Sequence, residues 1–191
     1  MNDFFVKLST RLSNASKIVF MGIGEEKLSD DGVGPYIISE LLPHANENVL
    51  FINAGIDPMS RVEDVVSFAP SHLVLIDTCT LNGPPGTVAI LARENISDYV
   101  PISTHTIPVH IVIDFIIEKL PDLDAFMIGI VPESLEGFIE LKQFGEGDIP
   151  LEEFSENIDL PFFQINLTKI IQNVADQLIS MIKNLIKKKW N

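Results

Sequence analysis

The sequence contains very little cysteine: Cys79 is the only one in 191 residues. A single cysteine excludes a disulfide within the chain, so no covalent cross-link contributes to the fold. The lack of disulfides agrees with a reducing compartment, although a secreted protein that uses none would look the same. Cysteine content alone therefore does not decide the compartment.

Long apolar runs are also missing. No segment has the roughly 20 consecutive apolar residues that a membrane-spanning helix needs. The amino-terminal segment Met1–Ser13 mixes Asp3, Lys7 and Arg11 with apolar residues, and it lacks the apolar stretch and cleavage site of a secretory signal. The chain is therefore expected to be cytoplasmic, with no membrane as a partner.

Basic residues are few. The 13 lysines and arginines stand against 27 acidic residues, which gives a net charge of -14. Such a charge repels phosphate backbones at long range, so no nucleic acid is expected as a partner. The one basic run, Lys187–Lys189, ends a predicted amphipathic helix, where positive charge complements the helix dipole. Docking of a partner on these lysines is the alternative interpretation.

What the sequence does contain is an alternation of short apolar runs with helical patterns. Strands are predicted at 18–23, 49–53, 73–76, 87–91 and 125–131, and helices at 33–42, 58–68, 108–120 and 167–187. This alternation predicts an α/β fold, a three-layer sandwich with a mostly parallel twisted sheet of about five strands flanked by helices. The run at 87–91 follows a turn at 82–86 and is expected to be an edge strand, antiparallel to its neighbour.

The chain length is typical of one domain, 1–191, built around a single core. The core is predicted at about 17–138, with a carboxy-terminal helix at about 167–187. Two segments stand outside the alternation. Phe4–Leu12 is predicted to be a short amphipathic helix before the first strand, and Glu140–Asn166 is interpreted as an insertion because it lacks clear periodicity.

Polar side chains follow three of the predicted elements. Asp30 and Asp31 come after the first strand, Asp77 ends the third, and His105 precedes the helix that begins near Pro108. The loops after parallel strands meet at one crevice, and two carboxylates with one imidazole can bind a divalent transition metal while leaving positions open. Taken singly, each residue has an alternative: the aspartates can cap a helix or brace a loop, and His105 can be an ordinary loop histidine.

The glycines after the first strand allow a second interpretation. Gly22 and Gly24 match the start of a dinucleotide-binding fingerprint, but Lys27 stands where its third glycine is needed. Acidic residues on both sides of Lys27 would also repel a pyrophosphate. A nucleotide-dependent enzyme is therefore the less favoured prediction.

The segment Gly22–Gly34 resembles the opening motif of the nickel-iron hydrogenase maturation endopeptidases, G-x-G-N-x-x-x-x-D-[DE]-G-x-G, with its spacing fully kept. The similarity continues through four further blocks in the same order, at 52–58, 75–78, 103–108 and 128–133, and covers about 17–138. One position departs from the motif, because Glu25 stands where the family has asparagine. The Asp57–Pro58 turn and the block at 128–133 are most similar to the branch that serves formate-linked and coenzyme F420-reducing hydrogenases.

The resemblance implies a hydrolase that removes a carboxy-terminal extension from a hydrogenase large-subunit precursor once nickel has been inserted. It also implies that Asp31, Asp77 and His105 are the metal-recognising and catalytic residues. The nickel is carried by the precursor, so the free enzyme is expected to be metal-empty. Asp30 is the spare carboxylate beside this set and is a further catalytic candidate; the alternative is a helix cap.

Other interpretations stay open at this point. Cys79 is predicted to be a small buried thiol rather than a nucleophile. His110 is expected in the core or near the site, whereas His44 and His72 are expected to be solvent-exposed. A non-catalytic chaperone that binds the nickel-loaded precursor would have the same ligands. The protein is predicted to be a monomer or a weak homo-oligomer.

Overall fold

The computed structural model describes residues 2–100, 107–135 and 167–190. Its five-stranded sheet has the order β2-β1-β3-β5-β4. The strands are β1 (Ile18–Ile23), β2 (Val49–Gly55), β3 (His72–Thr78), β4 (Val88–Ala92) and β5 (Asp124–Ile130). All neighbours are parallel except β4, which pairs antiparallel with β5 at one edge. The predicted mostly parallel sheet and its antiparallel edge strand are both confirmed.

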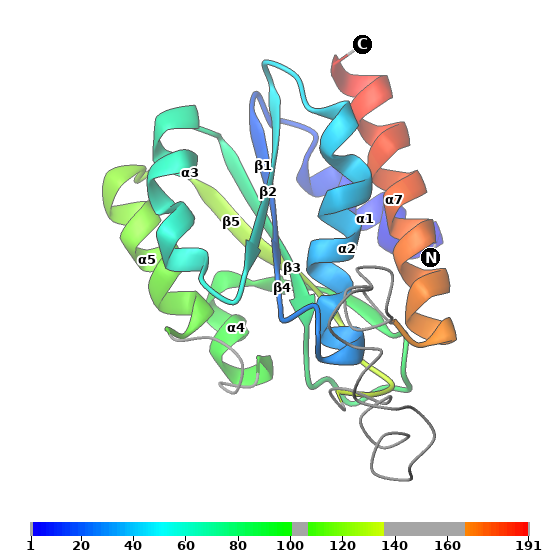
Figure 1. Ribbon diagram of the computed structural model, residues 1–191. Helices are drawn as coiled ribbons and strands as arrows, with labels where there is room; N and C mark the ends of the chain where they lie inside the picture. The colour runs from blue at the N-terminus through cyan, green and yellow to red at the C-terminus, as the bar shows by residue number, and fades with distance from the viewer. Residues whose placement is uncertain (1, 101–106, 136–166, 191) are drawn as a thin grey trace, which may run out of the picture.

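Helices cover both faces of this sheet, as Figure 1 shows. One face carries α1 (Asn2–Arg11), α2 (Val33–Leu41) and α7 (Lys169–Trp190), and the other carries α3 (Val62–Phe68), α4 (Arg93–Tyr99) and α5 (Val109–Lys119). Short 3-10 helices η1 (Ser29–Gly32), η2 (Leu42–His44) and η3 (Pro58–Arg61) flank α2 and α3. The three-layer sandwich predicted from the sequence is thus the observed architecture.

The strands form because their residues are apolar on both faces. Every residue of β1 and of β3 is buried, which is the pattern of central strands covered by helices on each side. Alternate residues enter two separate clusters: Phe20 packs under α2 and α7, whereas Met21 packs under α3 and α5. Phe20 also stacks on Phe51 of β2, with ring centroids 5.5 Å apart. These two cores hold the carboxyl ends of the strands in fixed positions.

The element boundaries differ from prediction in a few places. Helix α4 was not expected, because Arg93–Tyr99 is short and polar and only Ile96 of the segment is buried. The helix predicted at 58–68 begins with the 3-10 turn η3 before α3. The interpretation of 140–166 as an insertion lies outside the described residues. Within the described part of the chain, no helix is long and apolar enough to cross a bilayer.

His72 is buried, so the prediction that it would be solvent-exposed is wrong. It begins β3 beneath the amino-terminal helix, where Ser71 Oγ lies 2.9 Å from its Nδ1 and the Asp124 carboxylate lies 3.6 Å from its Nε2. Burial lowers the pKa of His72, and the charge of Asp124 opposes that effect. Arg11 completes the cluster by donating to Asp124 at 2.7 Å. The added helix α1 therefore supplies the cover that the strand pattern alone did not reveal.

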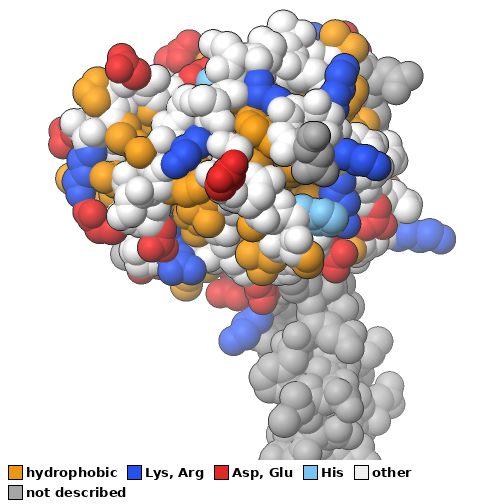
Figure 2. All heavy atoms as spheres, turned by 90° about the horizontal axis from the view of Figure 1, so that it is seen from above, with side chains coloured by type: hydrophobic (Ala, Val, Ile, Leu, Met, Phe, Trp, Pro, Cys, Tyr) orange, Lys and Arg blue, Asp and Glu red, His pale blue; other side chains and the backbone are white. Residues whose placement is uncertain are grey.

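The amino ends of the strands face the viewer in Figure 2, where acidic and basic side chains are intermixed with apolar ones. The carboxyl end of α7, with Lys187–Lys189, lies at this end of the molecule. Lys189 donates to the Ser13 carbonyl, and Trp190 Nε1 donates to the Ser16 carbonyl at 3.2 Å. These contacts tie α7 to the segment between α1 and β1.

Candidate functional site

The candidate site lies where the chain leaves the two central strands. After β1 the chain passes through η1 and α2 to β2 on one side, and β3 lies on the other side of β1. Neighbouring parallel strands whose connections diverge in this way leave a crevice at their carboxyl ends. Asp31 in η1 and Asp77 at the end of β3 both stand at this crevice.

Asp31 is buried, with 3% of its surface exposed. Its Oδ2 accepts the Glu25 N–H at 2.7 Å, and its Oδ1 accepts the Thr78 hydroxyl at 3.1 Å. The first bond fixes the carboxylate to the loop that follows β1, and the second fixes it to the end of β3. Each carboxylate oxygen has two lone pairs, so these bonds leave Asp31 able to bind another group.

Asp77 is also buried, and Thr78 connects it to Asp31. The Thr78 N–H donates to Asp77 Oδ1 at 2.7 Å while the Thr78 hydroxyl donates to Asp31. The structure thus brings together two of the three ligands predicted from the sequence. The sequence alone does not predict a role for Thr78, although this residue belongs to the block at 75–78 that carries the resemblance. A hydroxyl directly after a strand-end aspartate is the signal that was available.

The glycines of the opening motif serve close packing around these aspartates. A Cβ on Gly34 would lie 2.4 Å from the carbonyl oxygens of both Ile23 and Ile76, so the start of α2 rests directly on the ends of β1 and β3. A Cβ on Gly24, whose φ is +132°, would lie 1.9 Å from the Asp31 carbonyl oxygen. The glycines at these positions therefore let the loop after β1, together with η1 and α2, approach the sheet closely enough to place Asp31 beside Asp77.

Substituting Gly34 by alanine is expected to destabilise the fold by about 3 kcal/mol, because neither carbonyl can move without disturbing a central strand. The measurement is urea unfolding followed by circular dichroism. Gly55→Ala is the control: its φ of +52° is strained for alanine, but a Cβ there meets nothing within 4 Å. That variant should lose about 1 kcal/mol. Equal stability losses in the two variants would contradict this account of the motif.

His105 lies outside the described residues, so its predicted place as the third ligand is not tested. Among the residues that the structure describes, no group of three histidine, cysteine, aspartate or glutamate side chains is arranged to hold a metal ion. His44 is exposed after α2, as expected, whereas His110 is half-buried in α5 and its predicted place in the core or near the site stays a prediction. The described part of the site is a pair of buried carboxylates joined by one threonine.

Comparisons with known proteins identify the family. The family model described as HycI, hydrogenase maturation protease, matches residues 35–150. A Methanocaldococcus jannaschii protein described as a candidate hydrogenase maturation protease is 31% identical over 68% of this chain and 80% of its own length. The chain belongs to the hydrogenase maturation protease family. It is therefore a hydrolase, as predicted.

Solved structures show the same fold. The hydrogenase maturation protease HycI of Thermococcus kodakarensis superposes with a TM-score of 0.73 at 24% identity, over 95% of this chain and 99% of that one. The hydrogenase maturating endopeptidase HybD of Escherichia coli superposes with a TM-score of 0.60 at 18% identity, over 91% and 94% of the two chains. The matched family range contains Asp77 and His105 and begins just after Asp31.

In this protease, the Asp30 carboxylate binds parts of the chain that are far apart in sequence. It is fully buried, and Oδ2 accepts the N–H groups of Glu133 and Ser134, each at 2.9 Å, and the Thr168 hydroxyl at 3.1 Å. Oδ1 accepts the Thr168 N–H at 2.7 Å. Asp30 therefore joins η1 to the segment after β5 and to the start of α7. Neither η1 nor α2 has a side-chain cap in the described part of the chain, so the alternative that Asp30 caps the following helix is not observed there, and its catalytic assignment stays a prediction.

Glu25, the one position that departs from the opening motif described above, uses its main chain to support the site. Its N–H donates to Asp31, and its side-chain Oε1 accepts the Lys27 N–H at 3.2 Å. The side chain thus closes a local turn in the loop after β1. The substitution keeps the main-chain bond to Asp31, because that bond does not depend on the side chain.

Cys79 is a buried thiol, as predicted. Burial raises its pKa to about 12, and the nearby charge of Asp77 adds to this effect. A thiol with this pKa stays protonated at neutral pH and is a poor nucleophile. Its sulfur packs against Gly129 of β5, where a Cβ would lie 2.7 Å from the Sγ atom.

We expect Cys79→Ala to keep precursor cleavage within about threefold of the wild type, because the thiolate is not formed at the working pH. In parallel, a thiol-labelling reagent at pH 8 should modify Cys79 in unfolded protein and leave the folded protein unlabelled. Loss of activity in the alanine variant, without loss of stability, would show instead that the thiol takes part in the reaction.

Proposed function

We propose that this protease removes the carboxy-terminal extension of a nickel-iron hydrogenase large-subunit precursor after nickel has been inserted. The observation that supports the proposal is the pair of buried carboxylates, Asp31 and Asp77, held beside each other by Thr78 at the ends of the central strands. His105 is the proposed third member of the set. The predicted similarity to the formate-linked and F420-reducing branch is part of the same proposal.

The ligand chemistry explains how such a site would recognise nickel without removing it. In the precursor the nickel is held by soft cysteine thiolates, whereas carboxylate oxygens and one imidazole are harder ligands. Two carboxylates and a histidine provide only part of a coordination shell, and the precursor's thiolates provide the rest. Binding is therefore strongest when nickel is present, and metal loading becomes the condition for cutting.

Hydrolysis itself needs a water molecule and a group that accepts its proton. Water adds to the carbonyl carbon of the scissile bond, the C–N bond breaks, and the proton passes to the leaving amine. A carboxylate of the Asp31 and Asp77 pair is the proposed carrier of that proton, with the precursor's nickel polarising the carbonyl. Cys79 takes no part, because its thiol is buried and protonated.

The decisive experiment mixes the purified protease with nickel-loaded and nickel-free large-subunit precursor and follows the precursor mass. We expect the loaded precursor to lose its extension and the nickel-free precursor to keep it. If a stable complex forms and neither precursor is shortened, the chain is a chaperone for the loaded precursor. Cleavage of both precursors at equal rates would overturn the nickel-recognition step.

A further inference from the structure

Strand β2 forms an edge of the sheet, and main-chain N–H and C=O groups point outward from that edge. The Asn48 carbonyl accepts the Ile18 N–H of β1, so the main-chain N–H and C=O of the next residue, Val49, point away from β1. The Val49 N–H donates to the Asn46 carbonyl, and the Val49 carbonyl accepts the Asn46 N–H. Because strand residues alternate, Phe51 and Asn53 also direct their N–H and C=O groups outward. Within the described ranges, no strand pairs with β2 on that side.

A groove of about 570 Å³ runs along this outer edge. Its apolar lining comes from Leu42 after α2, Leu50 of β2 and Phe68 at the end of α3, and Arg61 and Asp64 line it on the α3 side. Figure 1 shows α2 and α3 on either side of β2. A strand edge that no other described strand pairs with, lying beside apolar side chains, is the geometry that binds an extended peptide by strand addition.

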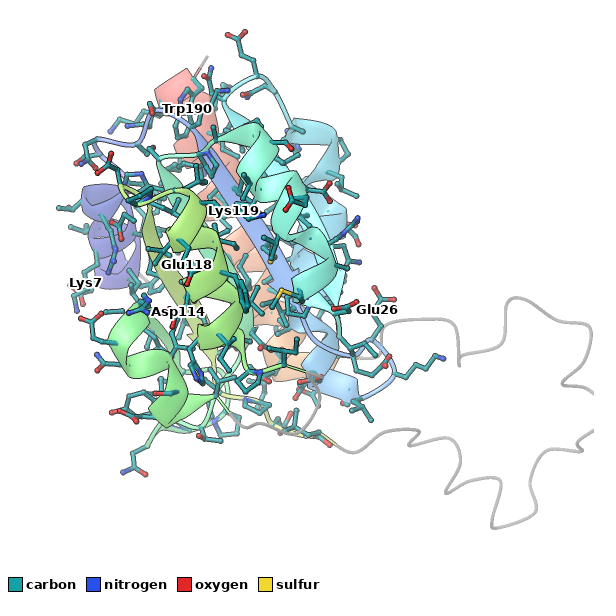
Figure 3. The ribbon with its side chains drawn as sticks, turned by 90° about the vertical axis from the view of Figure 1, so that its left-hand side faces the viewer. Lys7, Glu26, Asp114, Glu118, Lys119 and Trp190 are labelled. Atoms are coloured by element: carbon teal, nitrogen blue, oxygen red, sulfur yellow. The ribbon has the colours of Figure 1, made fainter. Side chains whose placement is uncertain are left out.

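The groove leads to the candidate site. Asn53 lines its end near the carboxyl terminus of β2, and Asn53 Nδ2 donates to Glu26 Oε1 at 3.2 Å. Glu26, labelled in Figure 3, belongs to the loop whose Glu25 N–H binds Asp31. The Gly24 N–H also donates to the Gly55 carbonyl at 3.0 Å, which ties this loop to the end of β2. A peptide in the groove would therefore have one end beside the Asp31 loop.

We propose that the precursor's carboxy-terminal extension adds to the outer edge of β2 as a further strand, antiparallel to β2. The inference rests on the proposed function, which places the scissile bond at the carboxyl ends of the strands. From there the extension continues in its carboxy-terminal direction toward the amino end of β2, which fixes the antiparallel sense. Phe51 and Asn53 supply the main-chain bonds, and the walls at Leu42, Leu50 and Phe68 hold apolar side chains of the extension.

Strand addition predicts a response with a period of two residues in the substrate. Proline placed singly along the extension, beyond the two residues that follow the scissile bond, removes one N–H at a time. With nickel-loaded precursor, KM should rise about tenfold when the lost N–H faces β2 and change little at the positions between. Uniform tolerance, or equal losses at consecutive positions, would overturn the proposal.

The protease side of the groove is tested with Leu42→Asp, because Leu42 is 49% exposed and its loss should not disturb the core. We expect KM for the loaded precursor to rise about tenfold with kcat unchanged. Val6→Asp is the matched control. Val6 is 61% exposed on α1, which contacts β4 at the opposite edge of the sheet, and its KM should stay at the wild-type value.

The outcomes separate the groove from the proposed function. If the wild-type protease cuts loaded precursor while Leu42→Asp and the proline series behave like wild type, the groove proposal is overturned and the function stands. If wild type cuts nothing, the function fails, and amide hydrogen exchange with loaded precursor decides about the groove. Slower exchange at Phe51 and Asn53 would support docking there, and unchanged exchange at both would overturn it.

Discussion

Replacing Asp31 or Asp77 by asparagine is expected to lower cleavage of nickel-loaded precursor by about 10²- to 10³-fold. Each substitution removes a negative charge from the pair that is proposed to contact the nickel and to carry the proton. A neutral amide is a poorer ligand and cannot act as the base. Single-turnover cleavage, followed by the mass of the precursor, measures the effect.

The Asp31 substitution should leave the fold nearly unchanged. At Asp31, an asparagine oxygen can accept the Glu25 N–H while its amide donates to the Thr78 hydroxyl, which is able to turn round and accept. A melting temperature close to that of the wild type would therefore accompany the loss of activity. Wild-type cleavage rates in both variants would remove these residues from the site.

Asp30→Asn is expected to destabilise the fold, with a loss of about 3 kcal/mol in the free energy of unfolding. Both oxygens of Asp30 accept main-chain N–H groups, from Glu133 and Ser134 on one side and from Thr168 on the other. A main-chain N–H can only donate, so the amide NH2 of an asparagine would face one of these N–H groups and form no hydrogen bond with it. The buried N–H that loses its acceptor lowers the free energy of unfolding.

The contrast between neighbouring residues makes this prediction specific. In a chain of this size, about 3 kcal/mol corresponds to a fall of roughly 6–12 °C in melting temperature. Asp31→Asn, one residue away, is the matched control and should melt near the wild type. A stable Asp30→Asn variant that had lost cleavage would show instead that Asp30 acts in the reaction, as the sequence had allowed.

The sequence predicted the parts of the fold that depend on local patterns. The apolar runs of β1 and β3 located the two central strands, and the rule that parallel strands end at one crevice placed Asp31 near Asp77. The glycine spacing at 22–34 indicated the family, but its physical reason lies in tertiary packing. The Gly34 backbone rests on the carbonyls of two different strands, which no local pattern reveals.

Long-range contacts were beyond sequence reasoning. The partners of Asp30 lie 103 to 138 residues away along the chain, and nothing in local periodicity links them. His72 looked exposed because it begins a strand, yet a helix from the amino terminus covers it. The outer edge of β2 could not be recognised either, since strand order is a property of the whole sheet. The carboxylate pair was thus predictable from the sequence, whereas the long-range hydrogen bonds and packing around it were not.

The nickel environment itself tests the central claim most directly. Nickel K-edge X-ray absorption should be recorded on loaded precursor alone and on loaded precursor frozen rapidly with excess protease. We predict added oxygen or nitrogen ligands with the wild-type protease, and no added oxygen ligands with the Asp31→Asn, Asp77→Asn double variant. An identical nickel spectrum with and without wild-type protease, in a sample that goes on to be cleaved, would contradict the account.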